Sequence, residues 1–449
     1  MSDTLKHLAE TALSAAKAAG AESADVLCAR GDGISMEIRN GALEQAERAE
    51  GTDIGLRVLI GQRQACVSIS DTREAAIEAM AARAVAMARE APEDPSAGLA
   101  DPDQLATSWD VAALDLDDPA PATEAAELAE RARRAEAAAL AAKGISQVST
   151  AGADYQRTEL YLLASNGFAG GYARTNHSTA CVAIAGEGLE MERDYAFDSR
   201  THAEDMDSAE EIGALAAERT LARRGAKQPK TGAYPVLFDE RISSGLIGHL
   251  VSAVNGSAIA RGTSWLKGAM GEAVLPKGFS LVEEPKRTRV SGSRPFDAEG
   301  LPALGGDIVT DGVMMRWILD LATARRLGLQ STGNAARGVG SPPSPSAGNL
   351  RLVAPMVARD ELLRDMGEGL LVTSLMGSSI NPNTGDYSRG ASGFWVRNGQ
   401  IAEPVNECTI AGNLRDMLQT LRAADDAREH LSRVVPSLLV EGLTVAGSA

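Results

Sequence analysis

The sequence predicts an α+β protein in which amphipathic helices are combined with antiparallel hairpins. Asn-Gly steps at 40–41 and 166–167 favour tight hairpins, because this pair accepts positive φ at both central positions. Alanine-rich stretches with helical periodicity flank the hairpins, and strands and helices do not alternate as in βαβ units. We therefore expect an N-terminal domain of helices and antiparallel strands, a middle segment that could duplicate it, and a larger β-rich C-terminal domain.

The first segment opens with a helix whose residues Leu5, Leu8, Ala12 and Ala15 share one face and which ends at Gly20. Short strands are expected over residues 24–30, 35–40, 43–49, 53–60 and 65–70. A long alanine-rich helix follows at 72–90, with Asp71 as its predicted N-cap.

A stretch rich in Pro, Asp and Ala then interrupts the periodic pattern over residues 92–121, which is typical of a linker. Beyond it come a helix, a hairpin, further strands and a second helix, in the same order as before. These elements are expected at residues 122–143, 158–164, 170–176, 179–186, 190–197 and 208–224. An internal duplication would explain this order; chance patterning is the alternative, because identity between the two copies is negligible.

The C-terminal part begins after a second break at 223–235 and carries one helix at about 240–255, followed by glycine-punctuated strands. We divide the chain into four parts on these boundaries: a first domain at 1–95, a linker at 96–121, a central domain at 122–228 and a C-terminal domain at 234–449.

Composition excludes several classes of function. Lys and Arg number 44 against 61 Asp and Glu, a net charge of −17, which argues against nucleic acid and anionic membrane surfaces as ligands. No apolar run is long enough to span a bilayer, and the N-terminus lacks the basic start and apolar block of a signal peptide. The four cysteines lie far apart, so we expect neither disulfides nor a cysteine-rich zinc site, and we expect a cytoplasmic protein.

The motifs of common catalytic sites are missing. There is no Walker loop, no dinucleotide-binding glycine motif and no G-x-S-x-G elbow, and Ser388 and Ser392 fit hydroxyls of a glycine-rich turn better than nucleophiles. H-E-x-x-H is also absent. The other isolated histidines, which we expect at the surface or partly buried, are His7, His177, His202 and His430.

His249 differs from these because it lies in the helix "SSGLIGHLVSAVNGS". Its spacing from Ile242, Leu246, Leu250 and Ala253 predicts a place within the buried stripe of the helix. A buried imidazole needs a hydrogen-bond partner or a metal, because leaving it unsatisfied costs free energy. The residues alone leave open whether His249 is a metal ligand, the remnant of one, or a core histidine.

Several longer stretches resemble the TldD/PmbA family over nearly the whole chain. In the C-terminal part these are "NPNTGDYSRGASGFWVRNGQI", "ECTIAGNLRDML" and a stretch ending in "STGNA", and the "TGDYSRG" and "STGNA" stretches are the specific ones. Upstream they are "EIRNGALEQAERAEGTDIGLRVLIGQRQACVSIS" and "ASNGFAGGYARTNHS". The family contains two kinds of subunit that pair in a cytoplasmic metalloprotease. In the catalytic kind, a helix carries H-E-x-x-x-H, and a downstream cysteine adds to the zinc site.

The matching window here is "SGLIGH", where Ser244 and Gly245 replace the first His and the Glu and His249 alone matches. Cys408 does not fill the place of the family's cysteine. The resemblance thus implies a PmbA (TldE)-like subunit with no catalytic or metal-binding residue of its own, in which His249 is a vestige. Zinc would belong to a TldD-like partner, and the pair would enclose peptides or unfolded proteins. The His residues of the intact motif are five positions apart, about 140° around a regular helix, so the motif needs an irregular turn to bring them together. Gly248 would permit such a turn here.

Two segments are candidates for contact with a peptide or the partner: Asp386, Tyr387, Ser388 and Arg389 in the first, Ser331 and Asn334 in the second. A local Asp–Arg pair in a hairpin turn is the competing explanation of the first, and exposed strand edges nearby could hold an extended peptide. Two other functions stay open: an autonomous hydrolase built around His249 with Cys408 or a serine, and a stand-alone peptide-binding homodimer.

Overall fold

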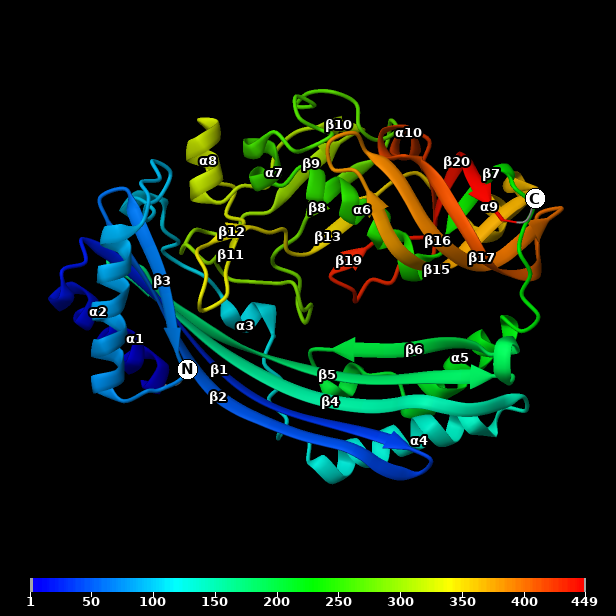
Figure 1. The fold of residues 1–449 in the computed structure, drawn as a ribbon, viewed down its shortest axis with the longest axis horizontal. Helices are drawn as coiled ribbons and strands as arrows, with labels where there is room; N and C mark the ends of the chain where they lie inside the picture. Colours follow the sequence, from blue (N-terminus) through cyan, green and yellow to red (C-terminus); the bar gives the residue numbers. More distant parts are fainter. Residues whose placement is uncertain (1–2, 448–449) are drawn as a thin grey trace.

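The computed structural model describes residues 3–447, and its N-terminal half is built on one six-stranded antiparallel sheet (Figure 1). The strands are β1 (Ser23–Arg39), β2 (Ala42–Ile60), β3 (Arg63–Ile69), β4 (Ile145–Ala164), β5 (Ala169–Ala185) and β6 (Glu192–Arg200). The helices are α1 (Asp3–Ala19), α2 (Glu74–Glu90), α4 (Ala125–Ala141) and α5 (Ala209–Ala222), with the short α3 (Val111–Leu114) between the two halves. The predicted α+β class is confirmed.

The strand order β3-β2-β1-β4-β5-β6 is symmetric about the antiparallel pair of β1 and β4. Each side has the chain order helix, three strands, helix. The segments expected as a first and a central domain therefore share a single sheet, and the repeated element order is a real feature of the fold. Between them, the predicted linker packs closely on its surroundings, with Ala100, Leu114 and Leu116 buried.

The two faces of this sheet have different partners. Along β1, Val26 and Cys28 pack with α1 and α2, and Ile34, Met36 and Ile38 pack with α4. Because strand side chains alternate, the intervening residues face the other way, toward the C-terminal domain. The four long helices thus cover one face, and the other face is left to the C-terminal half (Figure 1).

Several local predictions differ from the structure, and one difference is that the strands expected at 43–49 and 53–60 are a single strand, β2. The stretches 24–30 and 35–40 are one continuous strand, because Gly31 and Gly33 stay paired with β2 and β4 and do not form a turn. The helix α2 begins at Glu74 with Arg73 as N-cap; Asp71 lies outside it and accepts a hydrogen bond from the Arg73 backbone N–H. The Asn40-Gly41 turn has positive φ at both residues, as predicted.

The C-terminal domain holds two larger sheets and a small two-stranded one. One sheet has the order β14-β18-β20-β17-β16-β15-β7, and the additional pairing of β7 with β20 closes five of its strands into a ring. The other has the order β10-β9-β8-β13-β19. Helix α6 packs against strands of this ring, including β15, within one large apolar core.

The elements of this half are β7 (Gly232–Phe238), α6 (Glu240–Ala253), α7 (Gly256–Arg261), β8 (Ser280–Glu283), β9 (Gly306–Thr310), β10 (Val313–Met314), α8 (Leu321–Leu327), β11 (Ala335–Ala336), β12 (Ser344–Pro345), β13 (Leu350–Val353), β14 (Met356–Val357), α9 (Arg359–Met366), β15 (Gly369–Ile380), β16 (Asp386–Arg397), β17 (Gln400–Asn413), α10 (Leu414–Gln419), β18 (Arg422–Ala424), β19 (Arg433–Val434) and β20 (Leu438–Ala446).

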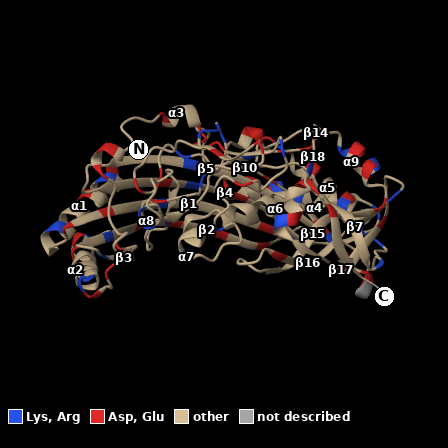
Figure 2. Ribbon diagram, turned by 90° about the horizontal axis from the view of Figure 1, so that it is seen from above, with Lys and Arg blue, Asp and Glu red and all other residues tan. Residues whose placement is uncertain are grey.

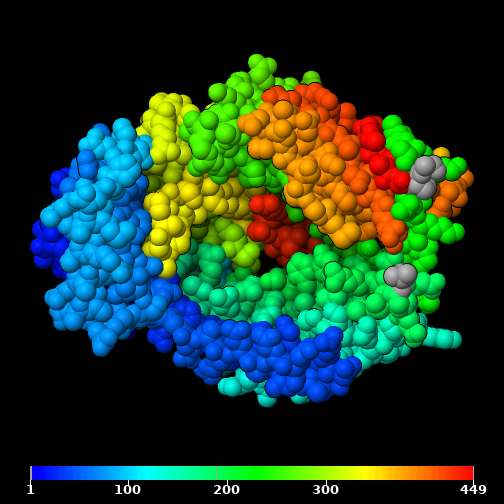
Figure 3. All heavy atoms as spheres, viewed as in Figure 1, coloured from blue at the N-terminus to red at the C-terminus, as the bar shows by residue number. Residues whose placement is uncertain are grey.

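The two halves touch at one end of the sheet, where Phe296 packs against Trp109 and Phe168. They also touch at β6, where Arg241 pairs with Asp194 at 3.3 Å and the Asn406 amide donates to Glu192 at 2.8 Å. Between these contacts the space-filling view shows a hollow between the sheet and the C-terminal domain (Figure 3). Acidic and basic residues are interspersed along the ribbon (Figure 2). Across residues 3–447, no helix is both long and apolar enough to cross a membrane.

Candidate functional site

Helix α6 is the element that carries His249. The Asp239 side chain caps its first turn by accepting from the Arg241 backbone N–H, and the helix continues without a break through Gly248. Its buried residues are Ser243, Leu246, Ile247, Leu250 and Ala253. The predicted place of His249 within this stripe is wrong: the buried arc is centred on Leu246 and Leu250, and His249 lies at its border, partly exposed.

His249 lies against the strand that holds the first candidate segment. Its ring meets the ring of Tyr387 on β16 edge-on, with centroids 5.7 Å apart. Burial lowers the pKa of His249, and the nearby Arg389 guanidinium lowers it further. Burial also raises the pKa of Tyr387 to about 12, so both groups are neutral near pH 7. The structure therefore brings His249 together with Tyr387 and Arg389 of the first candidate segment.

Alternation along β16 explains this grouping. Tyr387 and Arg389 are two residues apart and share the face that meets α6, while Asp386 and Ser388 belong to the opposite face. The local Asp–Arg pair does not form: Asp386 accepts instead from the Thr384 hydroxyl at 2.6 Å and the Asn413 amide at 3.1 Å. These hydrogen bonds lower the pKa of Asp386.

Strand β16 offers no open edge at the first candidate segment. β16 pairs with β15 on one side and with β17 on the other, so its backbone groups are already used. A peptide that reached Tyr387 and Arg389 would have to be held by side chains, because β-augmentation needs an unpaired edge.

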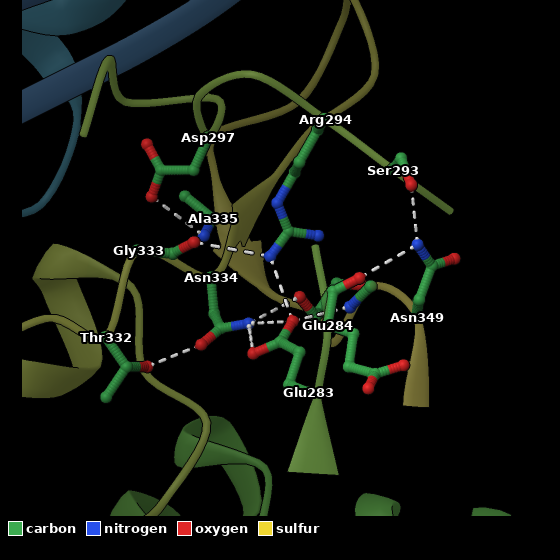
Figure 4. Close-up of polar contacts among 12 residues, drawn as sticks. Glu283, Glu284, Ser293, Arg294, Asp297, Thr332, Gly333, Asn334, Ala335 and Asn349 are labelled. Carbon is green, nitrogen blue, oxygen red and sulfur yellow. Dashed lines mark hydrogen bonds and ion pairs between the residues drawn. The ribbon is translucent and has the colours of Figure 1, made fainter. Parts of the chain in front are cut away.

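The second candidate segment belongs to a separate, buried polar network (Figure 4). The Asn334 side chain is 0% exposed; its amide donates to both carboxylate oxygens of Glu283, at 2.8 and 2.9 Å, and its oxygen accepts from Thr332. Arg294 and Arg316 complete the network by ion pairs to Glu283 at 3.1 and 3.0 Å.

This network corrects the surface role expected for Asn334, because a side chain without exposed area cannot contact a peptide in this conformation. Its contacts instead hold the 331–335 segment against β8. Ser331 remains partly exposed, and its hydroxyl donates to the Leu319 carbonyl at 3.2 Å.

Comparison with known proteins gives matches along most of the chain. Residues 24–88, 118–224 and 231–447 match, in order, PmbA/TldA metallopeptidase domain 1, central domain and C-terminal domain. The chain belongs to the PmbA/TldA metallopeptidase family. The resemblance noted in the sequence is thus confirmed, and the three matched segments cover both halves of the fold.

Full-length relatives of this family include the metalloprotease PmbA of Escherichia coli O157:H7, 36% identical over 99% of this chain and 96% of its own length. A PmbA homologue of Haemophilus influenzae is 33% identical with the same coverage. A crystal structure from Bacteroides thetaiotaomicron, described as a proposed modulator of DNA gyrase, has a TM-score of 0.89 at 28% identity and covers each chain completely. TldE of Thermococcus kodakarensis shares the fold, with a TM-score of 0.84 at 18% identity, over 99% of this chain and all of its own.

Helix α6 has different side chains at the two positions that the family resemblance compares with a His and a Glu. Ser244 and Gly245 offer no imidazole or carboxylate, and a Cβ at Gly245 would meet no atom within 4 Å. Ser244 and His249 are also about 140° apart on a regular helix. In residues 3–447 there is no group of three or more His, Cys, Asp or Glu side chains arranged to hold a metal.

The structure also assembles residues that carried no signal in the PmbA/TldA sequence. His177 and His202 are buried around Asp118, with His177 Nε2 3.2 Å and His202 Nδ1 3.8 Å from its carboxylate. This corrects the expectation that they lie at the surface or are only partly buried. Arg433 of β19 lies against α6, where its Nη1 would be 3.0 Å from a Cβ on Gly248. Neither grouping has a sequence spacing that could have revealed it, because each depends on tertiary packing.

Proposed function

We propose that this chain is the non-catalytic, PmbA (TldE)-like subunit of a two-chain metalloprotease. Its zinc would be held by a TldD-like partner, and the two chains would enclose extended peptides or unfolded proteins for cleavage. The observation that carries the proposal is the composition of α6: in a chain of a metallopeptidase family, the helix has His249 but Ser244 and Gly245 in the other two positions.

The alternative of an autonomous hydrolase finds less support. Cys408 is buried, its thiol donates to the Ala391 carbonyl at 3.2 Å, and burial raises its pKa to about 11. A thiol in this state is a poor nucleophile at neutral pH. The third hypothesis is a stand-alone homodimer that binds peptides. It requires no partner chain, and the experiment below distinguishes it from the two-chain complex.

Free thiols support a cytoplasmic location for the proposed complex. Cys28, Cys66, Cys181 and Cys408 are all unpaired in the structure. Reducing compartments keep cysteines in this form, so the proposed complex would work where disulfides do not form.

The test is co-purification with the TldD-like chain of the same organism, with zinc measured in each subunit and peptide cleavage measured for each chain and for the mixture. We expect zinc in the partner and cleavage only in its presence. Stoichiometric zinc in this chain alone, or cleavage by this chain that is lost in His249→Ala, would instead favour the autonomous hydrolase. A stable homodimer that does not bind the partner would favour the stand-alone peptide-binding homodimer.

A further inference from the structure

Arg389 is an arginine without a protein counter-ion. Within residues 3–447 its guanidinium makes no hydrogen bond or ion pair, and its Nε is buried without a partner. Arg397, at the far end of the same strand, shows the usual arrangement, with an ion pair to Glu403 at 2.7 Å. Burying guanidinium N–H groups unsatisfied costs free energy, so an acceptor from outside the described chain would relieve that cost.

Among the described residues, no carboxylate acts on the pKa of the two titratable groups beside Arg389. His249 and Tyr387 both lie near it, and Arg389 is the one charged group of the described residues that acts on the pKa of either. This is unusual for a chain with 61 Asp and Glu residues against 44 Lys and Arg. The local charge is therefore positive inside a protein whose net charge is negative.

A second guanidinium and an open space lie beside α6, the helix that carries His249. Arg433 contacts α6 at Gly248, beside His249, and its guanidinium has no hydrogen bond or ion pair within the described part of the chain. One turn earlier, Gly245 is exposed and leaves the space beside the helix empty. The imidazole of His249 likewise has no hydrogen-bond partner among residues 3–447 and is partly exposed, so it can still donate or accept.

We propose that Arg389, assisted by His249 and Arg433, forms a carboxylate-binding site on α6, and that its ligand is a carboxylate group of a bound peptide. A guanidinium offers two parallel N–H donors that match the two oxygens of a carboxylate, and such charge-assisted pairs are stronger than neutral hydrogen bonds. Gly245 leaves room for the ligand beside α6, because a Cβ at this position would meet no atom within 4 Å. No bond is made or broken at this site.

The proposal deepens the peptide-binding role proposed above and can be tested without the partner. The probe is a short, fluorescently labelled peptide of alternating alanine and serine, prepared as the free acid and as the C-terminal amide, with binding to the full chain measured by anisotropy. A third peptide carries one internal aspartate and an amidated end. Tighter binding of the free acid would identify a C-terminal carboxylate as the ligand, and tighter binding of the aspartate peptide would identify a side-chain carboxylate.

We expect the free acid or the aspartate peptide to bind at least about tenfold more tightly than the plain amide, the size of a charge-assisted hydrogen bond. Arg389→Met should remove this difference and Arg389→Lys should restore part of it. The matched control is Arg397→Met on the same strand, which should keep the difference. Thermal unfolding of each variant establishes that it is folded.

Equal binding of all three peptides, or a preference that survives in folded Arg389→Met, would overturn the proposal. A failure of the proposed two-chain protease looks different, because it is seen in co-purification and zinc content and leaves the binding of peptides to the isolated chain unaffected.

Discussion

Asp25 and Arg337 form a buried ion pair between two residues that belong to different halves of the molecule. Asp25 faces the C-terminal domain from β1, Arg337 follows β11, and their side chains are 3% and 0% exposed. Arg57 of β2 pairs with the same carboxylate. Although burial acts in the opposite direction, the two guanidinium groups hold the pKa of Asp25 below its usual value. One carboxylate thus holds two strands of the sheet and the C-terminal domain together.

Asp25→Asn should destabilise the chain strongly, because it leaves two buried guanidinium groups with a neutral partner. We expect a loss of roughly 3–5 kcal/mol in the free energy of unfolding, measured by urea denaturation. Glu50→Gln, which breaks the exposed pair with Arg48, is the control and should change stability by less than about 1 kcal/mol. Similar losses in the two variants would contradict the structural role of Asp25.

Gly55→Ala should disturb the contact between the halves, because a Cβ at this position would lie 1.8 Å from the Val339 carbonyl oxygen. The backbone must move to admit it, and we expect a cost of about 1–3 kcal/mol and a lower melting temperature. Gly51→Ala on the same strand is a matched control, since a Cβ there meets nothing within 4 Å. Equal melting temperatures for the two variants would contradict the close approach.

Asn334→Asp should destabilise the C-terminal domain by placing a second carboxylate against Glu283 and removing the two hydrogen bonds donated to it. Loss of a buried donor in such a network costs about 1–3 kcal/mol, and like-charge repulsion adds to this. Ser331→Ala, which removes a partly exposed hydroxyl, should have a much smaller effect on the urea midpoint. Wild-type stability in Asn334→Asp would show that the network is not structural.

Glu299→Gln should stabilise the chain increasingly as the pH rises. Burial, reinforced by the neighbouring Asp297, raises the pKa of Glu299 from 4.5 to about 8. The folded state therefore holds this proton more tightly than the unfolded chain, and the stability that it contributes below pH 4.5 is lost as the pH rises through about 8. The melting temperature of Glu299→Gln minus that of wild type should grow across this range.

The control for this pH series is Glu10→Gln at an exposed position of α1, for which the difference from wild type should stay flat. A flat difference for Glu299→Gln as well would mean that the Glu299 carboxyl is not buried in its protonated form.

Patterns local in the sequence predicted the secondary structure well. The N-terminal helix ends before Gly20, the Asn40-Gly41 hairpin has the predicted positive φ values, and the fold class is confirmed. The strands were predicted too short because Gly31 and Gly33 break the apolar alternation. In the structure, pairing on both sides of β1 compensates for their weak intrinsic preference for a strand.

The site could be predicted only in part, because its geometry depends on long-range packing. The family motif located His249 on α6 and Arg389 in a distant segment, but nothing in the sequence indicated that the two lie close together. Helical spacing also could not decide whether His249 lies inside the buried arc or at its border, because the neighbouring residue Leu250 is buried while His249 is partly exposed. The peptide- or partner-contact role predicted for Asn334 is wrong. The sequence could not indicate its buried position, because its partner Glu283 lies in a separate strand with no recognisable motif.

The central pairing of β1 with β4 has a consequence for how the chain acquires its structure during synthesis. Residues 23–69 can form their three strands early, but one long edge of β1 has no neighbour until residues 145–164 have left the ribosome. An unpaired edge of this length invites pairing with another nascent chain. The strands of residues 23–69 therefore depend on β4 for protection from aggregation. A fragment that stops at residue 95 should associate through the unpaired edge of β1.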